Sequence, residues 1–192
     1  MWTHILGRTR VRIASERQVP MNSHARIAVI GVGNDFRRDD GIGWAVVSRL
    51  RERAGHGPPP NGMELTVNDG DPGRLIGLWE DVDLAIVVDA AHAHPGRPGR
   101  VHRIELDGEE LRQPGQTSSH GLGLGEAVEL SRTLGRLPTR LVVFAVEGQD
   151  HTLGTGLTEP VAEVVEPLAQ RIEQEIIQYR NAAAHPPDSR RE

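Results

Sequence analysis

The chain has 192 residues, of which 27 are acidic and 22 basic, and a formal net charge of −5. All 22 basic residues are arginines, and cysteine is absent. The chain therefore has no lysine that could form a Schiff base and no thiolate that could act as a nucleophile, disulfide partner or zinc ligand. Any catalysis must use carboxylates, histidines, hydroxyls and backbone groups.

The mild negative charge argues against a nucleic-acid-binding protein, and no apolar run of about 18 residues is present that could span a membrane. Residues 1–24 contain four arginines but lack the apolar stretch of a signal peptide. We interpret them as a disordered leader, or as residues that precede a true start at Met21, and we expect a cytoplasmic protein. The length fits one domain over residues 25–180, followed by a flexible tail at 181–192.

The hydrophobic pattern of the first half predicts alternating strands and helices. In chain order these are a strand at 26–30 that enters a glycine turn at 31–34, a helix at 41–54, a strand at 64–68, a short helix from Pro72 and a strand at 84–88. The run at 84–88 is the most continuous apolar run in the chain, which is typical of a central strand covered on both faces. It ends in Asp89.

The second half predicts an edge strand, two helices and one more central strand. The loop at 90–99 is too short for a crossover helix, so the strand at 100–106 should return antiparallel at an edge of the sheet. A helix at 122–134, a strand at 140–145 and a glycine-rich loop at 148–157 follow, and the residues of that helix expected to face inward are Leu124, Ala127, Val128 and Leu134. The last helix should have Thr158 as its N-cap and a kink at Pro167.

Acidic residues follow the predicted strands, and ligands bind at this end of an open parallel sheet. They are Asp39, Asp40, Asp69, Asp89 and Glu147. If the strands are parallel, all five lie at one rim. His120 precedes the helix at 122–134 and is expected to join them near the start of that helix.

Structural roles are the alternatives for some of these acids. Asp39 or Asp40 could cap the helix at 41–54, and Asp69 could belong to an ordinary Asp-Gly turn. Asp89 differs, because an acid at the end of an apolar central strand is costly to bury without a partner. We therefore predict that Asp89 is a ligand or a general base.

Two carboxylates and an imidazole form a mixed oxygen and nitrogen site, which suits a divalent cation such as nickel, zinc or manganese. Without a cation, one of the carboxyls should have a raised pKa. His92 and His94 could add ligands, but histidines in a loop of proline and glycine are more typical of a solvated surface. His151 is a weaker candidate still.

The glycine turn at 31–34 does not complete a dinucleotide fingerprint, because Phe36 stands where the third glycine is required. Asp69 could otherwise mimic the acid that binds the ribose. The Gly-x-Ser-x-Gly elbow of a serine hydrolase is also absent. We therefore predict no organic cofactor.

Four motifs, in this order, resemble those of the hydrogenase maturation endopeptidases: Gly31-Val-Gly-Asn34, Asp39-Asp-Gly-Ile-Gly43, Asp89 at a strand end and Ser119-His-Gly-Leu122. The resemblance runs from residue 26 to about residue 172. It implies a three-layer α/β/α sandwich with a five-stranded, mixed, mostly parallel sheet and one antiparallel edge strand. It also implies an endopeptidase, metal-dependent or aspartic in type, that removes a C-terminal extension from the nickel-loaded large-subunit precursor of nickel–iron hydrogenase.

The resemblance implies a role for individual residues as well. The metal-contacting positions fall on Asp40, Asp89 and His120, and the catalytic acids on Asp40, Asp89 and Asp69. Glu147 matches the acid that follows the last strand. The nickel is expected to be carried by the precursor, and the protein to be monomeric or weakly associating.

This chain departs from the family pattern in three places, one of which is the arginine-rich segment 1–24, which has no family counterpart. The charged segment 35–38, Asp-Phe-Arg-Arg, stands where the family has an apolar pair, and Glu147-Gly148 replaces Glu-Pro. We expect these departures to affect which precursor the protein recognises more than the catalytic chemistry. Two other functions stay open at this point: a nickel-dependent binding or chaperone module that does not cut its partner, and a metallohydrolase of unrelated substrate. It also stays open whether a carboxylate activates water or a metal-bound water attacks.

Overall fold

The computed structural model describes residues 25–55, 62–106 and 122–184. In this part of the chain, five strands form one sheet in the order β2-β1-β3-β5-β4. Their bounds are β1 (Ile27–Val32), β2 (Met63–Asn68), β3 (Leu84–Ala91), β4 (Val101–Leu106) and β5 (Arg140–Glu147). β4 pairs antiparallel with β5 at one edge, and all the other pairings are parallel. The predicted mixed sheet with an antiparallel edge strand is confirmed.

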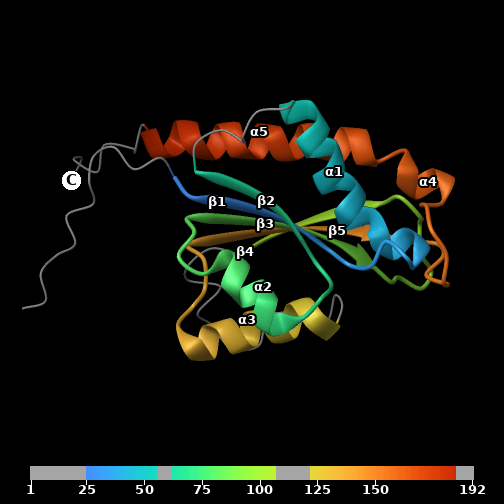
Figure 1. Ribbon diagram of the computed structural model, residues 1–192, viewed down its shortest axis with the longest axis horizontal. Helices are drawn as coiled ribbons and strands as arrows, with labels where there is room; N and C mark the ends of the chain where they lie inside the picture. The colour runs from blue at the N-terminus through green and yellow to red at the C-terminus, as the bar shows by residue number, and fades with distance from the viewer. Residues whose placement is uncertain (1–24, 56–61, 107–121, 185–192) are drawn as a thin grey trace, which may run out of the picture.

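Helices cover both faces of the sheet, so the fold has three layers (Figure 1). The helices α1 (Ile42–Ala54) and α5 (Val165–Ala184) lie on one face, and α2 (Pro72–Trp79) and α3 (Leu122–Leu134) lie on the other. A short 3-10 helix, η1 (Arg38–Gly41), precedes α1, and a single turn, α4 (Glu159–Ala162), precedes α5. The predicted α/β/α sandwich is confirmed.

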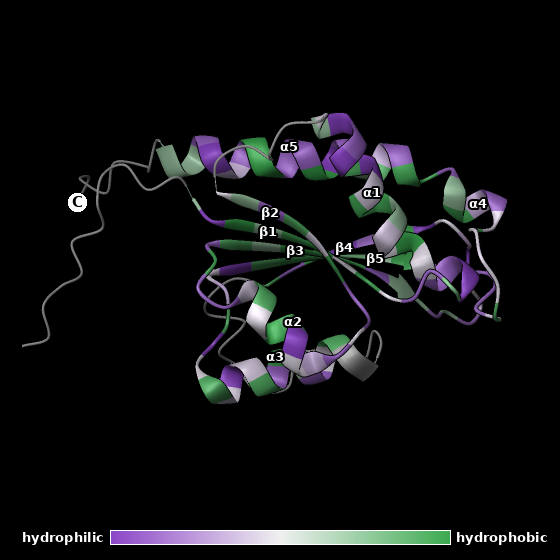
Figure 2. Cartoon of the chain, viewed as in Figure 1, coloured by the Kyte–Doolittle hydropathy of each residue, from purple (hydrophilic) through white to green (hydrophobic). Residues whose placement is uncertain are grey.

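Each face of the sheet has its own apolar core, because alternate residues of a strand point to opposite sides. In β3, Leu84, Ile86 and Val88 pack beneath α1 and α5, whereas Ala85 and Val87 pack against α2 and α3. All five side chains are buried. Figure 2 shows the resulting hydrophobic colour along most of β1 and β3. The prediction of a central strand covered on both faces is therefore confirmed.

Several elements run further than the hydrophobic pattern indicates. β3 continues to Ala91 and β5 to Glu147, and the register pairs Asp89 with Ala145 and Ala91 with Glu147. Asp89 and Glu147 thus lie within strands rather than after them, since the neighbouring strand supplies backbone hydrogen bonds whatever the side chain. α5 continues to Ala184, so residues 181–184, which the sequence assigned to the tail, are helical. Residues 1–24, interpreted as the leader, lie outside the described residues, as does 185–192.

Pro167 has a stronger effect than the predicted kink. α4 ends at Ala162, and Pro167 is the third residue of α5. Because proline lacks an amide hydrogen and its ring clashes with the carbonyl four residues earlier, one helix cannot run through residues 163–164. Thr158 is the N-cap as predicted, but its side chain makes no capping hydrogen bond.

The inward face of α3 is mostly as predicted. Leu124, Ala127 and Val128 are buried, but Leu134 is 52% exposed, so its prediction is wrong. The buried position near the end of α3 belongs instead to Ser131, which is fully buried beneath Trp79 of α2. None of the described helices has the length and apolar character needed to cross a membrane.

Ser131 joins the two helices of this layer. Its hydroxyl accepts a hydrogen bond from Trp79 Nε1 at 3.1 Å and donates one to the Arg136 carbonyl at 2.6 Å. We expect Ser131→Ala to lower the free energy of unfolding by about 1–3 kcal/mol, because the buried indole N–H loses its acceptor. Urea unfolding measures this loss. The control Thr133→Ala, on the exposed side of α3, should change the value by no more than about 0.5 kcal/mol. An equal effect of both substitutions would contradict the prediction.

Candidate functional site

The carboxyl ends of β1, β2, β3 and β5 meet at one rim of the sheet, because these strands are parallel. The 3-10 helix η1, the start of α1 and the loop before α4 lie at the same rim (Figure 1). The predicted acids are distributed over these elements. Asp39 and Asp40 are in η1, and Asp69 follows β2. Asp89 is the third residue from the end of β3, and Glu147 is the last residue of β5.

Asp40 and Asp89 form a pair of interacting carboxylates. Burial raises the pKa of Asp89 to about 7, with the charge of Asp40 adding to the increase and a hydrogen bond from the Ala90 amide opposing it. The expected carboxyl with a raised pKa is thus Asp89. A pKa in this range makes both the protonated and the ionised form of Asp89 accessible near neutral pH, so it can exchange a proton or lose one to an arriving cation.

Two glycines bring these acids together. Gly33 has φ 124°, and a Cβ at this position would lie 1.9 Å from the Asp40 carbonyl oxygen. A Cβ on Gly43 would lie within 2.6 Å of the Val32 and Val88 backbones. Only residues without a side chain let η1 fold back on β1 and let α1 begin directly against β1 and β3. The glycines of the two sequence motifs therefore position Asp40 over the end of β3.

Asp39 is fully buried and ties η1 to the loop that follows β5. Its Oδ2 accepts hydrogen bonds from the amides of Gln149 and Asp150 at 2.8 and 2.9 Å and from the Thr158 hydroxyl at 2.9 Å. Its Oδ1 accepts from the Thr158 amide at 2.7 Å. Burial alone would raise the pKa of Asp39, but these hydrogen bonds outweigh it and lower the pKa. We call this arrangement the Asp39 clamp.

The capping alternatives for both aspartates are therefore wrong. The N-cap of α1 is Gly41, with no side-chain cap hydrogen bond. The clamp also explains why Thr158, the N-cap of α4, makes no capping hydrogen bond with its side chain, since its hydroxyl donates to Asp39.

Glu147 has a structural set of partners. It is buried, accepts a hydrogen bond from the Arg97 amide and lies 2.6 Å from His102 Nε2. The hydrogen bond from Arg97, followed by that from His102, lowers the pKa of Glu147. Glu147 thus secures β4 and the loop before it.

Asp69 lies in a turn between β2 and α2. Its side chain is 55% exposed, with Oδ2 3.2 Å from an Arg74 nitrogen and Oδ1 accepting from the Asp71 amide at 3.3 Å. β1 separates β2 from β3, so the strand that Asp69 follows lies about 10 Å from the strand that contains Asp89. These contacts are those of the Asp-Gly turn alternative, and a catalytic role for Asp69 stays a prediction.

His120 lies outside the described residues. α3 begins two residues later, at Leu122, toward the carboxyl rim of the sheet in Figure 1. Within the ranges that the structure describes, no group of three or more His, Asp and Glu side chains could hold a metal ion. The third metal-contacting position, His120, therefore stays a prediction.

A contact between two histidines was not predicted. The rings of His92 and His151 lie with centroids 3.8 Å apart, and His151 Nδ1 is buried with no hydrogen-bond partner among the described residues. Burial, and then His92, lower the pKa of His151 against the opposing effect of Asp40 and other acids. The two residues lie in the loops that follow β3 and β5, which pair in register at Ala91 and Glu147, so no local sequence pattern could have paired them. His94 is exposed, as expected.

Residues 45–175 match the family model HycI, described as hydrogenase maturation protease. This match covers more than half of the chain. The chain belongs to the hydrogenase maturation proteases.

Individual relatives agree with this family. The chain is 28% identical over 148 residues to hydrogenase 2 maturation protease of Escherichia coli K12, covering 77% of this chain and 88% of the relative. It is 32% identical over 147 residues to hydrogenase expression/formation protein HupD of Bradyrhizobium diazoefficiens, covering 74% and 73%. The solved structure of the hydrogenase maturating endopeptidase HybD from E. coli has a TM-score of 0.63 at 27% identity, covering 80% of this chain and 93% of that one.

In this hydrogenase maturation protease, the matched region contains Asp69, Asp89, His120 and Glu147 but begins after Asp40. Asp40 is therefore included in the candidate site for two other reasons. Its charge acts on Asp89, and its backbone packs closely against Gly33.

Proposed function

We propose that this chain is the endopeptidase that removes the C-terminal extension of a nickel-loaded nickel–iron hydrogenase large-subunit precursor. The observation that supports this most is the pair of Asp40 and Asp89 at the open rim of a maturation-protease fold, with the pKa of Asp89 raised to about 7. General acid–base catalysis is most effective when the pKa of the catalytic group lies near the working pH, which this carboxyl satisfies at neutral pH.

The nickel is part of the substrate in this proposal. Asp40, Asp89 and His120 contact the nickel in the precursor, which positions the scissile bond and restricts cleavage to the metal-loaded form. Carboxylate oxygens and imidazole are suitable ligands for this cation. The arriving charge also favours the ionised form of Asp89, which releases its proton when the correct substrate is bound. Attack by water then depends on the ionised carboxylate, with Asp69 as a further candidate acid.

Intact-mass measurement of the precursor tests this function. We expect wild-type protein to reduce the mass of nickel-loaded precursor by that of the extension and to leave metal-free precursor unchanged. His120→Ala should slow the loss by at least about tenfold, because one contact to the nickel is removed. His94→Ala, which changes an exposed histidine of a different loop, is the control and should process at the wild-type rate. Intact precursor after incubation with wild type, or equal processing by His120→Ala, would contradict the proposal.

The same experiment separates the two alternatives. A binding or chaperone module would associate with nickel-loaded precursor without any loss of mass. A metallohydrolase of unrelated substrate would hold stoichiometric zinc when purified without a partner and would leave the precursor intact.

A further inference from the structure

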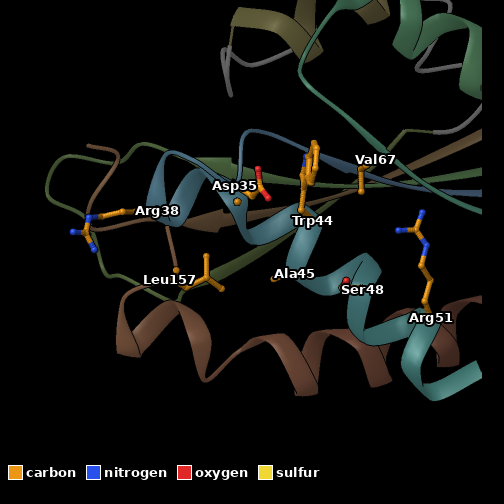
Figure 3. A pocket seen from close by; sticks show the side chains of 10 residues that line it. Asp35, Arg38, Trp44, Ala45, Ser48, Arg51, Val67 and Leu157 are labelled. Carbon is orange, nitrogen blue, oxygen red and sulfur yellow. The ribbon is translucent and has the colours of Figure 1, made fainter. Parts of the chain in front are cut away.

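A cavity of about 310 Å³ lies along α1, next to η1 and the loop before α4 (Figure 3). Its volume is in the range of sites for small ligands, about 300–1,000 Å³. Gly41, the residue after Asp40, forms part of its wall. The side chains that give the wall its chemical character are Asp35, Arg38, Trp44, Ser48, Arg51 and Leu157. The cavity thus begins at the catalytic rim and leads away from it.

The lining residues indicate an elongated shape. Gly41, Ala45 and Ser48 follow one another along a single face of α1, and Arg51 is one turn further on. In Figure 3, Arg38 and Leu157 lie at one end of the row and Arg51 at the other. A rise of about 1.5 Å per helical residue makes the distance from Gly41 to Arg51 about 15 Å. An extended peptide of four to five residues has this length. We call the cavity the α1 groove.

The polar groups of the α1 groove include unused donors. Trp44 Nε1 has no acceptor among the described residues, but this atom is buried, so it meets a ligand only if the indole ring turns toward the groove. Arg51 donates one N–H to the Leu65 carbonyl at 2.8 Å, which leaves further guanidinium donors for a ligand. Apolar contacts come from the Trp44 ring and from Leu157 and Val67. A peptide supplies what these groups lack, since its carbonyls accept hydrogen bonds and its side chains can be apolar or acidic.

We propose that the α1 groove binds an extended segment of the precursor that flanks the scissile bond, with an apolar side chain against Trp44 and an acidic group at Arg51. This proposal rests on the proposed function. The position of Gly41 next to Asp40 in the chain favours a substrate chain, because a peptide that leaves the groove at this end emerges at the rim where the acids lie. Charge disfavours the chain's own residues 1–24 as the occupant, since their four arginines would meet the guanidinium of Arg51, whereas Arg38 is paired with Asp150.

Processing kinetics test the groove without touching the acids. Ser48 is exposed on α1, so Ser48→Tyr should obstruct the groove while the helix stays intact, and Arg51→Glu should repel an acidic group. We expect each variant to raise KM for nickel-loaded precursor at least tenfold while kcat changes less than threefold. The control Arg136→Glu makes the same charge change at a residue that pairs with Glu80 outside the groove and should leave KM unchanged. The free energy of unfolding of each variant verifies the fold.

A photo-crosslinker identifies the occupant. Benzoylphenylalanine is incorporated at position 48 in the Asp89→Asn background, so that the precursor stays uncut, and crosslinked peptides are mapped by mass spectrometry. A crosslink to the precursor next to the cleavage point supports the proposal. A crosslink to this chain's own residues or to a second copy overturns it, as does no crosslink at all. If wild type cleaves the precursor but Ser48→Tyr and Arg51→Glu keep its KM, the groove proposal fails and the proposed function stands. If wild type leaves the precursor uncut, the proposed function itself fails.

Discussion

Asp89→Asn should abolish precursor processing and at the same time increase the free energy of unfolding at pH 8. Asp89 is a mostly buried carboxyl with Asp40 nearby, and its pKa is raised to about 7. Above that pH the folded wild type must hold a desolvated charge, which asparagine removes without changing the shape of the side chain. Since one pKa unit corresponds to about 1.4 kcal/mol, we expect a gain of about 1–3 kcal/mol. Loss of the proton acceptor should reduce the processing rate by about 100-fold or more.

The pH dependence of the free energy of unfolding shows why Asp89→Asn should stabilise the fold at high pH. Between about pH 4 and pH 7 the folded wild type keeps a proton on Asp89 that the unfolded chain releases, so the contribution of this group to stability falls as the pH rises. The advantage of Asp89→Asn should therefore be complete above pH 7 and disappear toward pH 4. Urea unfolding from pH 4 to pH 8, with a chelator present, measures it. Asp81→Asn, an exposed aspartate between α2 and β3, is the control. A variant no more stable than wild type at pH 8, or one that still processes precursor, would contradict the prediction.

Asp39→Asn should have the opposite effect on stability, lowering the free energy of unfolding by about 2–4 kcal/mol. Each hydrogen bond to a buried charged group contributes about 1.5–3 kcal/mol, and the Asp39 clamp has four of them. Asparagine replaces one of the two accepting oxygens with an NH2 group. The N–H donors of this group would then face the donors of the clamp at that position. Because η1 carries Asp40 as well, release of the clamp should also slow processing.

Two measurements check the Asp39 clamp. The pKa of Asp39 is lowered in the fold, so its stabilisation is present above the ordinary value of 3.8 and is lost as the pH falls through the lower folded value. Asp39→Asn should remove this acid sensitivity. Hydrogen exchange should accelerate at the amides of Gln149, Asp150 and Thr158. The control Thr158→Val removes only the hydroxyl donor and should cost about 1 kcal/mol. Unchanged exchange at these amides would contradict the role of the clamp.

Asp39 and Asp89 show why residue type alone does not define a role at this rim. Both are aspartates with low exposure, close to the same sheet ends. Asp39 has four donors and a lowered pKa, whereas the principal hydrogen bond of Asp89 is to the Ala90 amide and its pKa is raised. The first is suited to holding the fold together, and the second to exchanging a proton.

Local sequence patterns predict most of the fold. The apolar run at 84–88, the short loop at 90–99 and the spacing of Leu124, Ala127 and Val128 predict a central strand, an antiparallel edge strand and a helix, all of which are confirmed. The ends of the elements are harder to predict, because pairing between β3 and β5 extends both strands beyond their apolar residues. The order of acids along the chain likewise predicts the rim, since strand direction alone brings strand ends together.

The sequence by itself determined the chemical inventory, the family and the rim at which its acids gather, because composition, motif order and hydrophobic period are properties of the chain. Only the tertiary structure decided which acid does what. Asp39 accepts hydrogen bonds from a loop more than one hundred residues away in sequence. Glu147 is in hydrogen-bond contact with His102 of the neighbouring strand. A carboxylate takes its pKa and its role from the donors, charges and solvent around it. These surroundings come from segments that only the packed fold brings into contact.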